Sequence, residues 1–307
     1  MINQKINIYQ IDAFTSESFS GNPAGVTFAD GISDADKQRI AREMNLAETA
    51  FLSTSDKADY KLQWFTPLIE VDLCGHATIA SLHFLNEQNL LKESIIKFET
   101  RSGILNCGIK DGKYFMQIPV YQTDYYDGNT DQIVEALGIH PSDLFVDVPF
   151  VLCSNKYLYV YVKSLDALGK LKPDFKTLRN LSVEKKDFQA VTVFTLETFD
   201  DDSTAHSRFF APFYGIDEDP VTGSSNGPLL LVLLKLGFIQ LSDSEIQLNF
   251  EQGDFINRKG RVGVTYYKTD LMEELFISGQ AVTVLKGEMT FTQSASVDLN
   301  EKLNLPA

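Results

Sequence analysis

The sequence predicts an α+β fold of two similar domains, each a mostly antiparallel β-sheet or barrel wrapped around one central, buried α-helix. Three observations lead to this prediction. The same series of motifs occurs once in each half of the 307-residue chain. Two helical segments are apolar nearly all round, as buried helices are. The segments around them are short, β-rich and separated by turn residues, a pattern typical of antiparallel sheets.

The first half starts with an alternating strand, "KINIYQIDAF". An amphipathic helix follows at 34–44, with Ser33 placed to cap it and Asp36 three residues later. A strand then ends in Phe65-Thr66-Pro67, and a loop leads to Gly75 and an apolar helix. The motif "FETRSG" closes the half.

The second half repeats this order. An earlier helix is predicted near 131–137, and the strand "AVTVFTLET" precedes Phe210-Ala211-Pro212. A loop three residues longer than its counterpart leads to Gly223 and an apolar helix that ends near Gly237. "FEQG" and the strands "RVGVTYYKT" and "QAVTVLKGEMTF" complete it.

Length and charge narrow the class of protein. A chain of this length favours two domains of roughly 150 residues, which we place at residues 1–125 and 126–307. Lys and Arg total 27 against 42 Asp and Glu, and the net charge of −15 repels a phosphate backbone or an anionic membrane. We therefore expect neither nucleic acid nor a membrane as partner.

The N-terminal sequence and the cysteines indicate where in the cell the protein is expected. The alternating N-terminus lacks the apolar core of a signal peptide, and the apolar run 229–234 is far shorter than a membrane span. Cys74, Cys107 and Cys153 are odd in number and widely spaced, which fits neither a disulfide framework nor a Cys-x-x-Cys metal site. We expect a cytoplasmic protein with reduced thiols.

Equivalent residues start the two apolar helices, Gly75-His76 in one half and Gly223-Ser224 in the other. A two-fold arrangement would point both helix N-termini at a shared cleft, where unpaired N–H groups and helix dipoles favour a carboxylate or phosphate. The alternative is that the glycines merely let the chain turn before a helix. Spacing alone leaves both interpretations open.

Other chemistry at these helix starts is disfavoured. Cys74 and His76 are two residues apart, a spacing that should point their side chains in different directions. His76 and His83 are seven apart, whereas helical zinc sites use a spacing of four, so we predict no metal and expect His83 to pack against the sheet. Residues 223–227 match a hydrolase nucleophile elbow, but the last histidine, His206, precedes the serine and the order fails.

Two carboxylates are candidates for proton transfer. Glu48 lies in the apolar stretch "NLAETAFL", where its pKa should rise into the useful range. Counting back 18 residues from Thr66 reaches Glu48, and the same count from Ala211 reaches Val193, so only one half carries the carboxylate. Asp219 ends an acidic turn that is either solvated or turned toward the cleft.

Taken together, these motifs resemble the PhzF-like family, the phenazine-biosynthesis isomerases and their relatives, which share the diaminopimelate epimerase fold. The resemblance covers nearly the whole chain and rests on "IDAFTSESFSGNPAGV", "NLAETAFL", "WFTPLIEVDLCGHATIA", "FETRSG", "RFFAPFYGIDEDPVTGSS" and "EQG". It implies two similar domains, each with a central helix, an active site between them, no cofactor and a homodimer.

The resemblance also implies roles for single residues. Glu48 matches the family's catalytic carboxylate, and His76 and Asp219 match its supporting polar residues. Gly75 and Gly223 match its anion-binding turns, and Ser224 the serine at the second helix start.

Related epimerases use two opposed cysteines, one per domain. Here Cys74 stands at the first place and Thr222 at the second, so two-thiol racemisation is not available. Thr222 joins Gly75, Gly223 and Ser224 as expected substrate-binding residues. Three departures from the family pattern are expected to touch substrate: Ala47, the pair Ser225-Asn226, and the pair Val262-Gly263.

The resulting expectation is a cofactor-independent isomerase that moves a proton on a small carboxylate-bearing metabolite, with Glu48 as general acid and base. His76 and Asp219 would orient the substrate or relay the proton. The alternative is a small-molecule binding protein on the same fold that has lost turnover. The altered residues at Ala47 and in "SSNGP" favour this alternative slightly.

Overall fold

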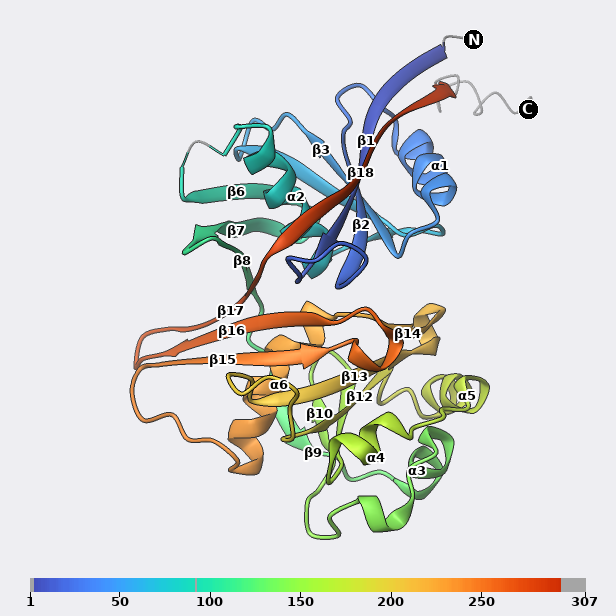
Figure 1. Cartoon of the computed structure of the whole chain (residues 1–307), viewed down its shortest axis with the longest axis vertical. Helices are drawn as coiled ribbons and strands as arrows, with labels where there is room; N and C mark the ends of the chain where they lie inside the picture. The colour runs from blue at the N-terminus through green and yellow to red at the C-terminus, as the bar shows by residue number, and fades with distance from the viewer. Residues whose placement is uncertain (1–2, 92, 294–307) are drawn as a thin grey trace, which may run out of the picture.

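The computed structural model describes residues 3–91 and 93–293 and shows a mixed, sheet-dominated α+β fold. Its elements gather into an upper and a lower lobe (Figure 1). The upper lobe contains β1 Asn3–Ala13, β2 Asn22–Phe28, α1 Asp34–Met44, β3 Glu48–Ser53, β4 Tyr60–Phe65, β5 Glu70–Val71, α2 Gly75–Glu87, β6 Ile95–Thr100, β7 Gly103–Lys110, β8 Lys113–Ile118 and β18 Ala281–Thr292.

The lower lobe holds the remaining elements and three short 3-10 helices. They are β9 Thr123–Tyr125, α3 Asp131–Leu137, η1 Pro141–Asp143, β10 Val151–Cys153, β11 Tyr157–Tyr161, α4 Leu165–Gly169, α5 Phe175–Lys185, β12 Ala190–Thr195, β13 Ala205–Ala211, η2 Pro212–Tyr214, β14 Ile216–Asp219, α6 Gly223–Leu236, β15 Glu245–Gln252, η3 Asp254–Ile256, β16 Gly260–Lys268 and β17 Glu273–Gly279. Within the described ranges, none of these helices combines the length and apolar character that a membrane span requires.

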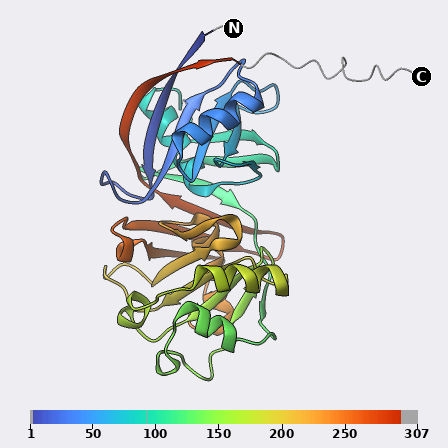
Figure 2. The same ribbon diagram turned by 90° about the vertical axis from the view of Figure 1, so that its right-hand side faces the viewer.

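The same order of strand pairings occurs twice. Most pairings are antiparallel, but β2 pairs with β3 and β4 with β6 in parallel, and β11–β12 and β13–β15 do the same in the lower lobe. The pairing of β8 with β17 joins the two lobes. The predicted boundary at residues 125 and 126 stays a prediction, because β18 lies beyond it in sequence and pairs along β1 in the upper lobe (Figure 2).

The earlier helices follow from local capping. The Ser33 side chain accepts a hydrogen bond from the Asp36 N–H at the start of α1, as predicted. α3 occupies the predicted residues. The helix that precedes β12, as α1 precedes β3, is α5, which the sequence analysis missed. Asp174 caps it, and Leu178 and Leu181 bury its inner face.

The helices α2 and α6 are buried, as their composition predicts. Nine residues of α2 and ten of α6 are buried. Pro228 lies inside α6 and has no N–H to donate to the Ser224 carbonyl, four residues earlier. That carbonyl instead accepts a hydrogen bond from Asn155 Nδ2 at 3.4 Å. A side chain of the neighbouring loop thus replaces the missing helical bond.

The strand register corrects one predicted equivalence. Phe65 pairs with Thr49, and Phe210 pairs with Val191, so the residue one place earlier, Ala190, is the counterpart of Glu48. The count to Val193 was wrong because the connection from β12 to β13 is three residues longer than that from β3 to β4. The asymmetry itself remains, since an alanine stands where the first half has its carboxylate.

Candidate active site

The N-termini of α2 and α6 meet, and two glycines make the approach close. A Cβ added to Gly75 would lie 3.6 Å from the Gly223 Cα and 3.0 Å from the Ile277 Cδ1. A Cβ added to Gly223 would lie 2.4 Å from the same Ile277 atom. Neither glycine has a positive φ, so the turn-only interpretation fails. The glycines are required by close packing, and the positive ends of two helices converge beside β17.

Glu48, Cys74 and His76 form one cluster beside this meeting point. Glu48 Oε2 lies 3.3 Å from His76 Nε2, and Cys74 Sγ lies 3.5 Å from His76 Nδ1. The prediction that Cys74 and His76 point apart was wrong. Cys74 occupies the N-cap position of α2 in an extended conformation, with φ −142° and ψ 113°, and this brings its thiol to the His76 ring.

Burial sets the protonation of the cluster. Burial raises the pKa of Glu48 from its ordinary value of 4.5 to about 8, and the nearby Asp219 carboxylate adds to the rise. Burial lowers the pKa of His76 to about 3 and raises the pKa of the Cys74 thiol well above its usual range. Thiol and imidazole are therefore both neutral near pH 7, and the absence of a Cys–His ion pair has an electrostatic cause rather than a geometric one.

Asp219 is buried rather than solvated, which decides between its two interpretations. Its carboxylate accepts hydrogen bonds from Thr222 Oγ1 at 2.5 Å and from Asn22 Nδ2 at 2.9 Å. Burial raises the pKa of Asp219 to about 6, and these two hydrogen bonds oppose the rise. The three acidic residues of this turn have different environments: Asp219 is buried, Asp217 is exposed, and Glu218 forms an ion pair with Arg208.

Sequence reasoning missed Asn22, which joins the two lobes at the site. Its Nδ2 also donates to the Val221 carbonyl at 2.9 Å. The strand pairings make Asn22 the counterpart of Asn155. Asn22 stands two residues before the residue that pairs with Glu48, and Asn155 stands two residues before the residue that pairs with Ala190. Asn155 bonds the Ser224 carbonyl in the first turn of α6, and Asn22 bonds Asp219 and Val221 just before that helix. An asparagine in both copies of the repeat was the signal that could have identified them.

The serines and threonine at the start of α6 have separate environments. The Thr222 N–H donates to Gln252 Oε1 at 2.9 Å. Ser224 is half-buried, and its side chain beside the half-buried Tyr157 phenol opposes the rise that burial causes in the pKa of Tyr157. His206 bonds Glu251 at 2.8 Å rather than Ser224, which agrees with the rejection of a hydrolase triad.

The three departures lie in different places. Asn226 is buried and bonds the Thr222 carbonyl and Gln252, and Ser225 bonds Thr192, so this pair fixes the helix start rather than facing open space. Val262 is fully buried in the hydrophobic core, so the expectation that it touches substrate was wrong. The structure gives no contact that tests Ala47.

The cluster also offers metal donors. One ligand atom each from Glu48, Cys74 and His76 lie within 4.8 Å of one another, the one such group among the described residues. Carboxylate, thiolate and imidazole together suit Zn²⁺. The spacing argument considered histidine pairs alone and so missed this grouping; the prediction of no metal stays a prediction. His83 packs between Tyr114 of β8 and Thr283 of β18, as expected.

Known proteins resemble this chain over nearly its whole length. The family model "Phenazine biosynthesis-like protein" (PhzC-PhzF) matches residues 11–287. An uncharacterized isomerase of Clostridium acetobutylicum is 39% identical over 93% of this chain and 98% of its own length, and the uncharacterized isomerase YfhB of Bacillus subtilis is 33% identical over 91% and 97%.

Solved structures agree with this result. A phenazine biosynthesis protein of the PhzF family from Bacillus anthracis superposes with a TM-score of 0.87 at 32% identity, covering 93% of this chain and 99% of that one. A hydroxyproline epimerase from Agrobacterium vitis, at 11% identity and a TM-score of 0.59 over 93% and 92% of the two chains, shares the fold alone. The chain therefore belongs to the PhzC-PhzF family of phenazine biosynthesis-like proteins, whose curated relatives include several named as isomerases.

Proposed function

We propose that the chain is an isomerase that moves a proton between carbon atoms of a small carboxylate-bearing metabolite without a cofactor. One observation supports this most: Glu48, whose pKa burial raises to about 8, lies 3.3 Å from His76 Nε2 at the point where two helix N-termini meet. A general base works best when its pKa is near the working pH. The converging dipoles favour the carboxylate of a substrate.

Each residue then has one role. The Glu48 carboxylate takes the proton from one carbon and returns it to another. His76, neutral at the pH of the cell, orients the substrate or Glu48 by hydrogen bonding. Asp219, held by Asn22 and Thr222, positions the start of α6 and adds to the rise in the pKa of Glu48. The amides near Gly75 and Gly223 hold the substrate carboxylate.

The test is hydrogen exchange at carbon. A panel of small carboxylic acids with an acidic C–H is incubated with the protein in heavy water, and deuterium uptake is followed by NMR. An acid that exchanges is then tested with Glu48→Gln, for which we expect at least about a hundredfold slower exchange with affinity little changed. Glu43→Gln, an exposed change on α1, is the matched control and should exchange at the normal rate. Equal rates for wild type and Glu48→Gln would contradict the role of Glu48.

The same measurement separates the alternative function. A binding protein without turnover would bind such an acid and exchange no carbon-bound hydrogen. Asn226 is buried and its side chain donates to the Thr222 carbonyl, which weakens the support that the "SSNGP" segment gives to a binding protein, while Ala47 still favours that alternative slightly. We therefore favour the isomerase.

We also propose that each lobe is a domain whose sheet surrounds one helix. α2 packs mainly against β1, β2, β3, β7, β8 and β18 and also touches β17 of the other lobe, and α6 packs against β9, β11, β16 and β17, which supports this arrangement. Substrate would then bind between the domains. A homodimer, which the family resemblance implies, remains a prediction that sedimentation velocity tests.

A further inference from the structure

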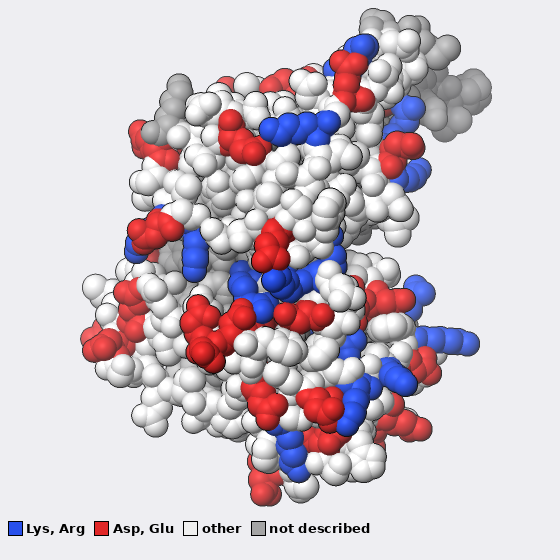
Figure 3. All heavy atoms as spheres, viewed as in Figure 1, with Lys and Arg blue, Asp and Glu red and all other residues white. Residues whose placement is uncertain are grey.

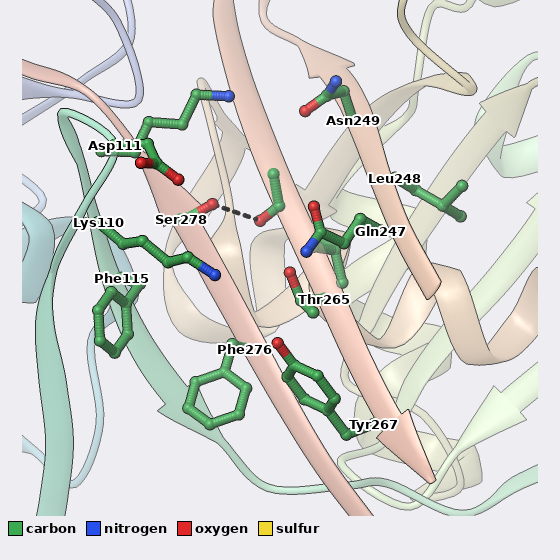
Figure 4. A pocket seen from close by; sticks show the side chains of 13 residues that line it. Lys110, Asp111, Phe115, Gln247, Leu248, Asn249, Thr265, Tyr267, Phe276 and Ser278 are labelled. Atoms are coloured by element: carbon green, nitrogen blue, oxygen red, sulfur yellow. Dashed lines mark hydrogen bonds between the residues drawn. The ribbon is translucent and has the colours of Figure 1, made fainter. Parts of the chain in front are cut away.

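A hollow of about 510 Å³ opens on the outer face of β15–β17, and the hairpin that joins β7 and β8 forms one wall of it (Figure 4). The side chains that line it include those of Lys110, Lys113, Gln247, Thr265, Phe276 and Ser278. None of the residues proposed above for isomerisation lines it. The hollow is thus separate from the Glu48 cluster.

The absence of a side chain at Gly263 keeps the hollow open. Gly263 pairs with Asn249 on one side and with Ser278 on the other, so the three form one row across the sheet. A Cβ at Gly263 would lie 2.5 Å from the Ser278 Oγ. Gly263 is one of the departures from the family pattern noted in the sequence. In the structure it lines this hollow and not the Glu48 cluster.

The wall beside the row is aromatic. Phe276 stands edge-to-face with Phe115 at 6.1 Å and with Tyr267 at 6.0 Å between ring centroids. All three rings are half-buried. Thr265 and Gln247 lie in the next row, level with Phe276, and supply hydroxyl and amide groups (Figure 4). A flat apolar body with polar substituents matches such a surface.

The charge of the hollow is opposite to that of the chain. Lys110 and Lys113 are exposed at the two ends of the hairpin turn, and no ion pair is found for either within the described residues. Asp111 is the single acidic side chain among the lining residues. Figure 3 shows Lys and Arg side chains at the waist between the lobes, with Asp and Glu side chains directly beside them. In a chain of net charge −15, two unpaired lysines above an aromatic wall favour an anion.

We propose that this hollow binds a small organic anion with a planar aromatic or conjugated body and a carboxylate or phosphate group. The body lies on Phe276 and its ring neighbours, and Lys110 and Lys113 hold the anionic group. Thr265 and Ser278 hydrogen-bond its polar substituents. This site is independent of the proposed isomerase chemistry, so it can be tested by binding alone.

The test uses phenyl phosphate and benzoate as probes, benzyl alcohol as the uncharged analogue, and the full chain. Calorimetry gives the affinity, and amide NMR shifts give the place. We expect the anions to bind at least tenfold more tightly than the alcohol and to shift the amides of Thr265 and Ser278. Comparing the two anions shows which anionic group is preferred.

Three variants make the result specific. Lys110→Ala with Lys113→Ala and, separately, Gly263→Ser should each weaken probe binding at least tenfold. Lys97→Ala with Lys172→Ala removes the same charge from exposed positions elsewhere and should not. The proposal is overturned if this control weakens binding equally, if Gly263→Ser has no effect, or if the shifts fall at Gly75 and Gly223. A dimer that shields both lysines from acetylation would also overturn it.

Discussion

The surroundings of Glu48 stabilise its protonated form relative to the anion. Ionisation of Glu48 in the folded chain therefore lowers the stability of the fold. Burial and the Asp219 carboxylate raise the pKa of Glu48 from 4.5 to about 8. The folded chain therefore binds a proton more tightly at this residue than the unfolded chain does. The associated stability is fully present below pH 4.5 and is lost as the pH rises through about 8.

Glu48→Gln should therefore stabilise the fold at alkaline pH, because glutamine mimics the protonated acid and stays neutral. We expect a higher melting temperature than wild type at pH 9, from a gain on the order of a few kcal/mol, and a smaller difference at pH 5.5. Thermal unfolding at both pH values measures this. Glu43→Gln, exposed in α1, should show no such trend. A wild type as stable as Glu48→Gln at pH 9 would mean that the Glu48 anion is not penalised.

Cys74 should be dispensable for chemistry although it touches His76. Burial raises the pKa of its thiol well above the usual range, and Thr222 stands where a second thiol would be needed. Cys74→Ser should keep most of the exchange activity, measured in heavy water with an acid that wild type exchanges. If the variant folds and binds that acid but exchanges nothing, the mechanism based on Glu48 is wrong.

Sequence could predict some residues of the site and not others. Glu48 was identifiable as a carboxylate in an apolar stretch, whereas the roles expected of His76 and Asp219 came from the family resemblance. Asn22 donates to Asp219, which is 197 positions away in the sequence. A local sequence pattern cannot predict a contact between residues so far apart. The contact of Cys74 with His76 was mispredicted because it depends on the backbone angles at the helix cap.

At the scale of elements, β17 controls how closely α2 and α6 approach. Ile277 lies against both helix starts, and its Cδ1 occupies the space that a side chain at Gly223 would need. The apolar composition of the helices predicted their burial. It could not predict α5, whose residues are mixed, nor the register of β12, which depends on the length of a surface loop.

Gly223→Ala should overpack this junction. The added methyl would lie 2.4 Å from the Ile277 Cδ1, and we expect a loss of about 1–3 kcal/mol in the free energy of unfolding. Ile277→Val removes that Cδ1, so the double variant should recover part of the loss, and denaturant unfolding of all four proteins gives the coupling. Additive losses would contradict direct contact as the cause.

At the scale of the whole molecule, the ends of the described chain complete one sheet. β1 pairs with β18 from Asn3 with Thr292 to Ala13 with Ala281, while β17 pairs with β8 (Figure 1). The internal repeat predicted two similar halves, but a repeat cannot show that the last strand of the chain returns to the first half. Such a pairing is long-range and closes late, because a long loop must be closed first.

The return of β18 leads to a prediction about the boundary at residue 125. In residues 1–125 alone, β1 keeps its pairing with β2 over Tyr9–Ala13 but loses β18, which pairs along its whole length, so we expect no cooperative unfolding transition from this fragment. In the antiparallel pair Thr292 lies opposite Asn3, so residues 281–293 can precede residues 3–125 through a short turn. This permuted fragment should melt cooperatively by circular dichroism, whereas a version with a Gly-Ser segment in place of 281–293 should not. If residues 1–125 melt cooperatively without β18, this fragment is a complete domain by itself. The β1–β18 pairing is then not required for its folding, and the boundary predicted from the repeat is correct.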